Sequence, residues 1–161
     1  MKPGLPQPRE AWIEWRRNGV AYLESVEPDK NGKTGQMSIP RSAKPLVLVV
    51  EDEPLVRMEV ADSLDRAGFA VLQAGDAAQA LSLLDQHAGI TILFTDIDMP
   101  GDIDGLRLAD MVRQRHPRIK IAITSGHNTA RIAAANLPGP FFPKPYDARS
   151  LADRLRAMIA A

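Results

Sequence analysis

From residue 46 onward the chain alternates between two hydrophobic patterns. Five short apolar runs have the length of buried strands. They span residues 46–50, 69–73, 91–95, 119–123 and 139–143. The segments between them repeat apolar residues every three or four positions, which indicates amphipathic helices. Clear examples are Val56, Val60 and Leu64, then Ala77, Ala80, Leu81 and Leu84, then Leu151, Leu155, Met158 and Ile159.

Strict alternation of strands and helices predicts the α/β class. Strands that are apolar throughout are typical of a parallel sheet covered by helices on both faces. We therefore expect residues 45–161 to form one domain, a doubly wound, five-stranded parallel sheet.

Residues 1–44 differ from the rest of the chain. They hold both tryptophans and carry eight basic against five acidic residues, and only residues 10–26 have helical spacing. We interpret them as an N-terminal extension, disordered or partly helical, with Met37 as an alternative native start. A docking helix that buries Trp12 and Trp15 against a partner is the other interpretation.

Composition excludes several function classes. Twenty Lys and Arg balance twenty Asp and Glu, which argues against a direct nucleic-acid binder. The lack of cysteine excludes disulfides, thiolate metal sites and cysteine nucleophiles. The apolar runs are far shorter than the roughly 20 residues that cross a bilayer, and no signal peptide is evident. We expect a cytoplasmic protein without membrane or nucleic-acid contact.

Polar residues that could do chemistry follow the predicted strands. Glu51 and Asp52 come after the first, Asp96 ends the third, Thr124 ends the fourth and Lys144 follows the fifth. The carboxyl ends of parallel strands share one edge of the sheet, where open α/β proteins bind their ligands. We therefore expect these five side chains to form one site.

The chemistry of this set favours phosphoryl transfer. Three carboxylates within about 4 to 5 Å would repel one another by a few kcal/mol per pair, so we expect a divalent cation among them. Oxygen ligands without histidine or thiolate favour Mg²⁺. A cation and an ammonium can neutralise the oxygens of a phosphoryl group while a side-chain oxygen attacks it in line.

The motifs at the strand ends resemble the receiver domain of two-component response regulators. The resemblance covers residues 46–161 and implies a flavodoxin-like fold with strand order 2-1-3-4-5. The motifs are Val49-Val50-Glu51-Asp52-Glu53, Phe94-Thr95-Asp96-Ile97-Asp98-Met99-Pro100-Gly101, Asp104-Gly105-Leu106, Ile123-Thr124-Ser125-Gly126 and Phe142-Pro143-Lys144-Pro145.

The resemblance implies a role for each site residue. Asp96 is the expected phosphoacceptor, and it forms the Mg²⁺ site with Glu51 and Asp52. Thr124 is the expected hydroxyl that follows the phosphoryl group. Lys144 is the expected amine that binds the phosphate.

Further expectations concern the loops around the site. The resemblance implies that the main-chain carbonyl of Asp98 completes the metal shell and that Lys144-Pro145 is a cis bond. The sequence departs from the common family pattern by one extra residue between Pro100 and Asp104. The Asp98 side chain adds a fourth carboxylate, which either steers a water toward the phosphoryl group or faces solvent.

The leading hypothesis is a single-domain response regulator rather than an enzyme with separate substrates. It would take a phosphoryl group on Asp96 from a sensor histidine kinase or a histidine phosphotransfer protein. The change would pass through Thr124 and the aromatic switch residue Phe141 to the face of the fourth helix, fifth strand and fifth helix. Because the chain stops after that helix, output would come from a downstream protein target or a phosphorelay.

Two alternatives belong to other classes. Asp96 and Asp98 resemble the nucleophile and general-acid pair of haloacid-dehalogenase-like phosphatases, although there the pair follows the first strand. The chain could also be a receiver-like binding module that is never phosphorylated, against which the complete set of acids, hydroxyl and lysine argues.

Overall fold

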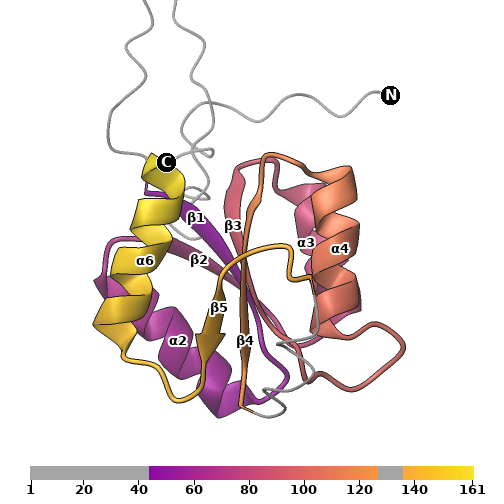
Figure 1. Cartoon of the computed structure of the whole chain (residues 1–161), viewed down its shortest axis with the longest axis horizontal. Coiled ribbons are helices and arrows are strands. Elements are labelled where there is room, and N and C mark those ends of the chain that lie inside the picture. The colour runs from indigo at the N-terminus through magenta and orange to yellow at the C-terminus, as the bar shows by residue number, and fades with distance from the viewer. Residues whose placement is uncertain (1–43, 127–135) are drawn as a thin grey trace, which may run out of the picture. The chain divides into compact units, whose positions relative to one another are not determined.

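The computed structural model describes residues 44–126 and 136–161, and their core is a five-stranded parallel sheet (Figure 1). The strand order is β2-β1-β3-β4-β5, which confirms the predicted fold class and topology. The strands are β1 (Leu46–Val50), β2 (Ala70–Ala74), β3 (Ile90–Asp96), β4 (Lys120–Ser125) and β5 (Phe141–Pro143). Residues 1–43, for which we predicted an extension, lie wholly outside the described residues. Most of the segment between β4 and β5, for which we predicted a helix, also lies outside them.

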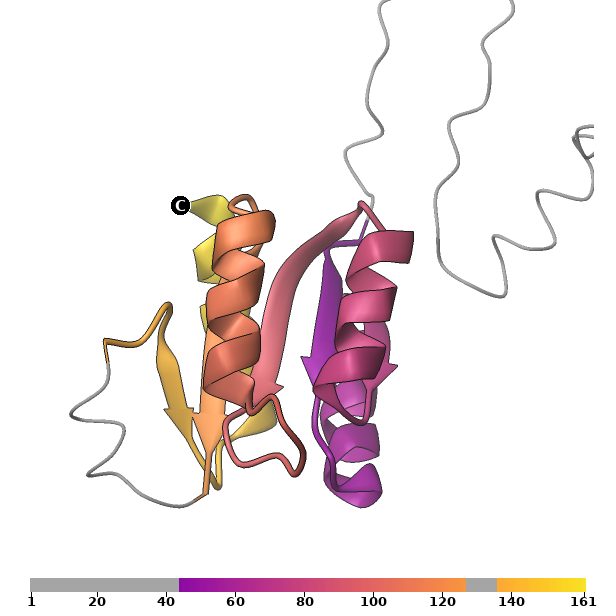
Figure 2. The same ribbon diagram turned by 90° about the vertical axis from the view of Figure 1, so that its right-hand side faces the viewer.

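Four described helices cover the sheet, two on each face (Figures 1 and 2). They are α2 (Pro54–Arg66), α3 (Ala77–Gln86), α4 (Gly105–Arg115) and α6 (Ala148–Ala160). Helices α3 and α4 share one hydrophobic core, and α2 and α6 share the other. Within the described ranges, no helix is long and apolar enough to span a membrane.

Strand β1 shows why the strands are apolar throughout. Leu48 and Val50 pack into the core beneath α3 and α4, while Val47 and Val49 pack into the core beneath α2 and α6. Successive strand residues point to opposite faces, so a strand that is covered on both faces needs apolar residues at every position.

Only β1 has its predicted bounds; β3 is one residue longer than expected at each end, β4 is shifted toward Ser125, and β2 and β5 start later than expected. Strand β2 begins one residue later than expected, because Phe69 belongs to the connection from α2, where its N–H donates to the Leu64 carbonyl at 3.0 Å. Strand β5 is shorter than expected and begins at Phe141. Pro140 before it has no N–H for the ladder. Gly139 passes so close to β4 that a Cβ atom there would lie 1.8 Å from the Ile121 carbonyl oxygen.

The helix starts face the edge where the strands end. Three helices begin with an aspartate cap, a residue type that favours this position. The caps are Asp76, Asp104 and Asp147, whose carboxylates accept from the backbone N–H three residues later at 2.7, 2.9 and 2.8 Å. Helix α2 instead has Pro54 in its first turn, where the missing N–H costs no hydrogen bond. The carboxyl edge of the sheet therefore gathers helix N-termini as well as strand ends.

Candidate functional site

Three carboxylates meet at the carboxyl edge of the sheet. Glu51 follows β1, Asp52 is its neighbour, and Asp96 ends the adjacent strand β3. One oxygen from each lies within 4.8 Å of the others. Glu51 and Asp96 are buried, whereas Asp52 is more exposed to solvent than either. The structure thus brings together the acids that the sequence predicted, in an oxygen-only arrangement that fits a hard cation such as Mg²⁺.

Lys144 joins two of these carboxylates. Its Nζ lies 2.6 Å from Glu51 Oε2 and 2.7 Å from Asp96 Oδ2. Its backbone N–H donates to the Ser125 carbonyl at 3.0 Å, so the end of β4 holds it in place. Burial acts to lower the pKa of Lys144, but the hydrogen bonds to Asp96 and Glu51 outweigh burial, and the pKa is raised. Lys144 is therefore a fixed positive charge at neutral pH.

Glu51 is subject to opposing influences. Burial is the largest and raises its pKa, whereas the hydrogen bonds from Lys144 and from the Glu53 N–H lower it. The neighbouring charge of Asp96 raises the pKa further, and the net shift is upward. One lysine thus leaves the cluster short of positive charge, which a bound cation would supply.

The loop after β3 is shaped around Asp96. The Asp98 N–H donates to Asp96 Oδ1 at 3.1 Å. A Cβ atom on Gly105 would lie 1.7 Å from the Asp96 carbonyl oxygen, so only glycine permits α4 to start here. In the lengthened part of the loop, Gly101 takes a φ of 108°, which favours glycine.

Thr124 points toward β5 in this structure. Its hydroxyl is buried and donates to the Phe142 carbonyl at 2.7 Å. Phe141, the predicted switch residue, is partly buried and packs against the core beneath α3 and α4. Lys144-Pro145 is a cis bond, as the resemblance implied.

Two residues were missed by sequence reasoning. The Ser125 hydroxyl donates to Asp98 Oδ2 at 2.5 Å, so the exposed Asp98 side chain has a protein partner. From the sequence we expected this side chain either to steer a water or to face solvent, and we did not predict the contact with Ser125. Arg57 donates from Nη1 to the Glu51 carbonyl at 2.7 Å. Both contacts depend on the paths of the loops that follow β1, β3 and β4, and no spacing rule reveals them. An arginine in the first turn of α2 was the one available signal, since the helix dipole disfavours cations there.

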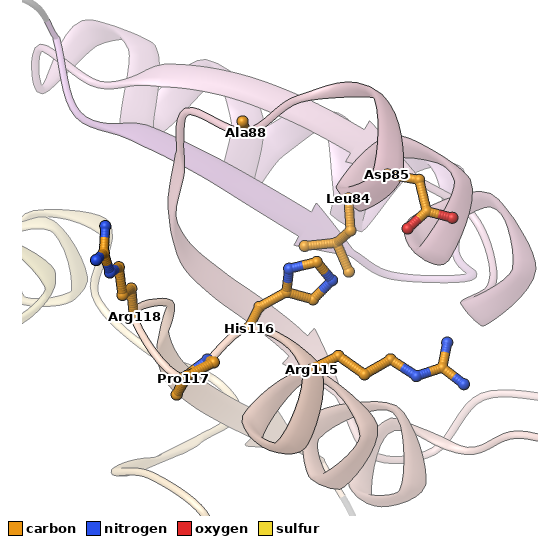
Figure 3. A pocket seen from close by; sticks show the side chains of 7 residues that line it. All are labelled: Leu84, Asp85, Ala88, Arg115, His116, Pro117 and Arg118. Atoms are coloured by element: carbon orange, nitrogen blue, oxygen red, sulfur yellow. The ribbon is translucent and has the colours of Figure 1, made fainter.

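Two depressions of about 430 Å³ each lie on the described surface. One adjoins the site and is lined by residues of α2 and of the segment after β5, Lys144 and Tyr146 among them. The other lies between the ends of α3 and α4, at the opposite edge of the sheet (Figure 3). There the His116 ring points toward Leu84, and none of the predicted site residues takes part.

The comparisons with known proteins agree with this geometry. Residues 47–156 match the family model of the response regulator receiver domain. The sensor kinase CckA of Brucella abortus is 34% identical over 123 residues, which are 73% of this chain and 13% of that protein. The transcriptional regulatory protein CpxR of Klebsiella pneumoniae is 33% identical over 115 residues, 70% of this chain and 48% of that protein.

Solved structures show the same fold. A receiver protein from Sinorhizobium medicae has a TM-score of 0.68 and 26% identity, with 73% of this chain and 96% of that one covered. The receiver domain of the hybrid histidine kinase CckA has a TM-score of 0.60 and 33% identity, with 71% and 98% covered.

The chain therefore belongs to the response regulator receiver family, whose members are signalling phosphoacceptor domains rather than classical enzymes. Receiver domains bind Mg²⁺ at an acidic pocket and interact with histidine kinases or phosphotransfer proteins. The chain spans less than half the length of the two curated relatives described above.

Proposed function

We propose that this receiver domain accepts a phosphoryl group on Asp96 while Mg²⁺ is bound by Glu51, Asp52, Asp96 and the main-chain carbonyl of Asp98. The observation that carries the proposal is the ammonium of Lys144, which lies within 2.7 Å of both Glu51 and Asp96. A cation in this position can bind a phosphoryl oxygen while a carboxylate oxygen attacks.

The chemical step is a displacement at phosphorus. A carboxylate oxygen of Asp96 attacks the phosphorus of a phosphohistidine, and the P–N bond breaks. The imidazole nitrogen leaves with the electron pair and takes a proton from solvent, and Asp96 carries the phosphoryl group as an acyl phosphate. Lys144, charged at neutral pH, turns an N–H toward the phosphoryl oxygens. Bound Mg²⁺ would supply further positive charge for those oxygens.

The donor in this proposal is a sensor histidine kinase or a histidine phosphotransfer protein. Similar domains occur in a protein named as a sensor kinase and in one named as a transcriptional regulatory protein, which supports a place in two-component phosphorelay. Output is to a downstream protein target. Thr124 would exchange its hydrogen bond to the Phe142 carbonyl for one to the phosphoryl group. The rearrangement would then reach Phe141, the neighbour of Phe142 on β5.

Incubation with acetyl phosphate and Mg²⁺, followed by intact-mass measurement, tests the proposal. The wild-type protein should gain the mass of one phosphoryl group, and Asp96→Asn should gain none, because an amide is a poor nucleophile. Asp102→Asn, an exposed acid in the same loop, is the matched control and should be modified like the wild type. An adduct that persists in Asp96→Asn would place the acceptor elsewhere.

A phosphate-release assay with a phosphomonoester, run beside the mass measurement, separates the alternatives. A haloacid-dehalogenase-like phosphatase would release inorganic phosphate from a phosphomonoester, and its nucleophile would follow the first strand, whereas Asp96 ends β3. A receiver-like module that is never phosphorylated would show neither an adduct nor turnover.

A further inference from the structure

Arg57 makes an unusual contact beside the acid cluster. It lies in the first turn of α2, where the helix dipole disfavours a positive charge. Within the part of the chain that the structure describes, it forms no ion pair with a carboxylate. Instead its Nη1 donates to the main-chain carbonyl of Glu51 at 2.7 Å. The side chain therefore acts on backbone geometry rather than on a neighbouring charge.

The carbonyl that Arg57 binds belongs to the peptide that joins Glu51 to Asp52. The Glu51 side chain is already held by Lys144 and by the Glu53 N–H. The backbone N–H of Glu51 donates to the Ala74 carbonyl at 3.1 Å. Asp52 differs, because no hydrogen bond or ion pair from any described residue holds its carboxylate. Its direction is thus set by the backbone, and Arg57 is the side chain that fixes that peptide.

Gly75, at the end of β2, leaves room for the arginine. A Cβ atom there would lie 3.1 Å from Arg57 Nη1 and 3.7 Å from its Cζ. The Gly75 N–H donates to the Gln79 side chain at 2.7 Å, which holds this turn against the start of α3. The guanidinium therefore lies between Glu51 and a turn that cannot take a side chain without displacing it.

We propose that Arg57 is a positioning residue for Asp52: by holding the Glu51–Asp52 peptide against Gly75, it keeps the Asp52 carboxylate directed into the cation site. This inference rests on the proposed Mg²⁺ site. It assigns Arg57 no contact with the phosphoryl group and no share in the chemical step.

The first test is Mg²⁺ affinity, measured by titration calorimetry on the whole chain. Arg57→Ala should raise the Kd for Mg²⁺ by about tenfold, the lower end of what loss of an outer-shell partner costs. Arg66→Ala removes the same charge from the exposed last turn of the same helix and should keep the wild-type Kd. Modification by acetyl phosphate should slow in Arg57→Ala at low Mg²⁺ and recover at saturating Mg²⁺.

A second variant tests the same idea without a change in α2. Gly75→Ala should raise the Kd in the same direction, because the added methyl group displaces the flexible end of Arg57. In the Arg57→Ala background, Gly75→Ala should add little, since its effect works through the arginine. Equal effects of Gly75→Ala in both backgrounds would overturn the role of Gly75. If Arg57→Ala does not fold, Gly75→Ala carries the test.

The outcomes distinguish this inference from the proposed function. If wild-type protein shows no Mg²⁺ binding, the proposed function fails first. If wild-type protein binds Mg²⁺, Asp52→Ala loses it, and Arg57→Ala keeps the wild-type Kd, the positioning role alone is wrong. A lower melting temperature in Arg57→Ala with an unchanged Kd would also contradict it, because that result describes a residue that only stabilises the fold.

Discussion

At the scale of single residues, the charged carboxylate of Glu51 lowers the stability of the fold at the position where the site needs a cation ligand. The structure buries its carboxylate and places it beside Asp96, and the hydrogen bond from Lys144 offsets these two costs only in part. A raised pKa means that the folded protein binds the Glu51 proton more tightly than the unfolded chain does. The stabilisation that the folded protein gains from protonated Glu51 is therefore fully present below the pKa of this group in the unfolded chain. It is lost as pH rises through the pKa of Glu51 in the folded protein.

Glu51→Gln should expose this effect. Its free energy of unfolding, relative to wild type, should rise as pH increases from about the ordinary glutamate value of 4.5 toward neutrality. Urea titrations at several pH values in that window, without Mg²⁺, give the difference. A difference that stays flat or falls with pH would show that Lys144 compensates the buried charge of Glu51 fully.

At the scale of elements, the start of α4 depends on one missing side chain. A Cβ atom on Gly105 would overlap the Asp96 carbonyl oxygen, which belongs to backbone and cannot move aside cheaply. We expect Gly105→Ala to destabilise the fold by about 3 kcal/mol, at the upper end of overpacking costs, and to impair phosphorylation. Gly89→Ala is the control, because a Cβ atom there meets nothing within 4 Å. Urea denaturation of both variants checks this, and equal stability would refute it.

The contact between β4 and β5 supports a second prediction at this scale. Thr124→Ala removes the donor to the Phe142 carbonyl, which should cost about 1 to 3 kcal/mol in the resting state. The nucleophile, the acids and Lys144 remain, so Asp96 should still be phosphorylated. The conformational change that phosphorylation causes at Phe141 should become smaller. NMR shifts around Phe141 and Tyr146, with and without beryllofluoride, measure it, and wild-type-sized shifts in Thr124→Ala would mean that the signal takes another route.

The elements themselves were largely predictable from sequence. The strands and helices follow from apolar spacing, and the strand ends brought Glu51, Asp96 and Lys144 together, because parallel strands share a carboxyl edge. The contacts of Ser125 with Asp98 and of Arg57 with Glu51 could not be predicted. They depend on loop paths and on rotamers, which periodicity does not describe.

At the scale of the whole molecule, the acid cluster ties together segments that are distant in sequence. Glu51 and Asp52 follow the interior strand β1, Asp96 ends the middle strand β3, and Lys144 follows the outermost strand β5. Unfolding separates these segments and destroys the site. Any ion that binds there therefore favours the folded state by mass action.

Magnesium should thus stabilise the entire domain. At an Mg²⁺ concentration one hundred times the Kd, the gain in free energy of unfolding should be about 2.7 kcal/mol, and it should grow with the logarithm of concentration. Asp52→Ala should abolish the gain. Without Mg²⁺ the same variant should be at least as stable as wild type, because removing one of three clustered carboxylates relieves repulsion. Thermal unfolding across an Mg²⁺ series measures both effects, with Asp102→Ala as a matched control that should respond like wild type. A wild-type response in Asp52→Ala would exclude this carboxylate from the cation site.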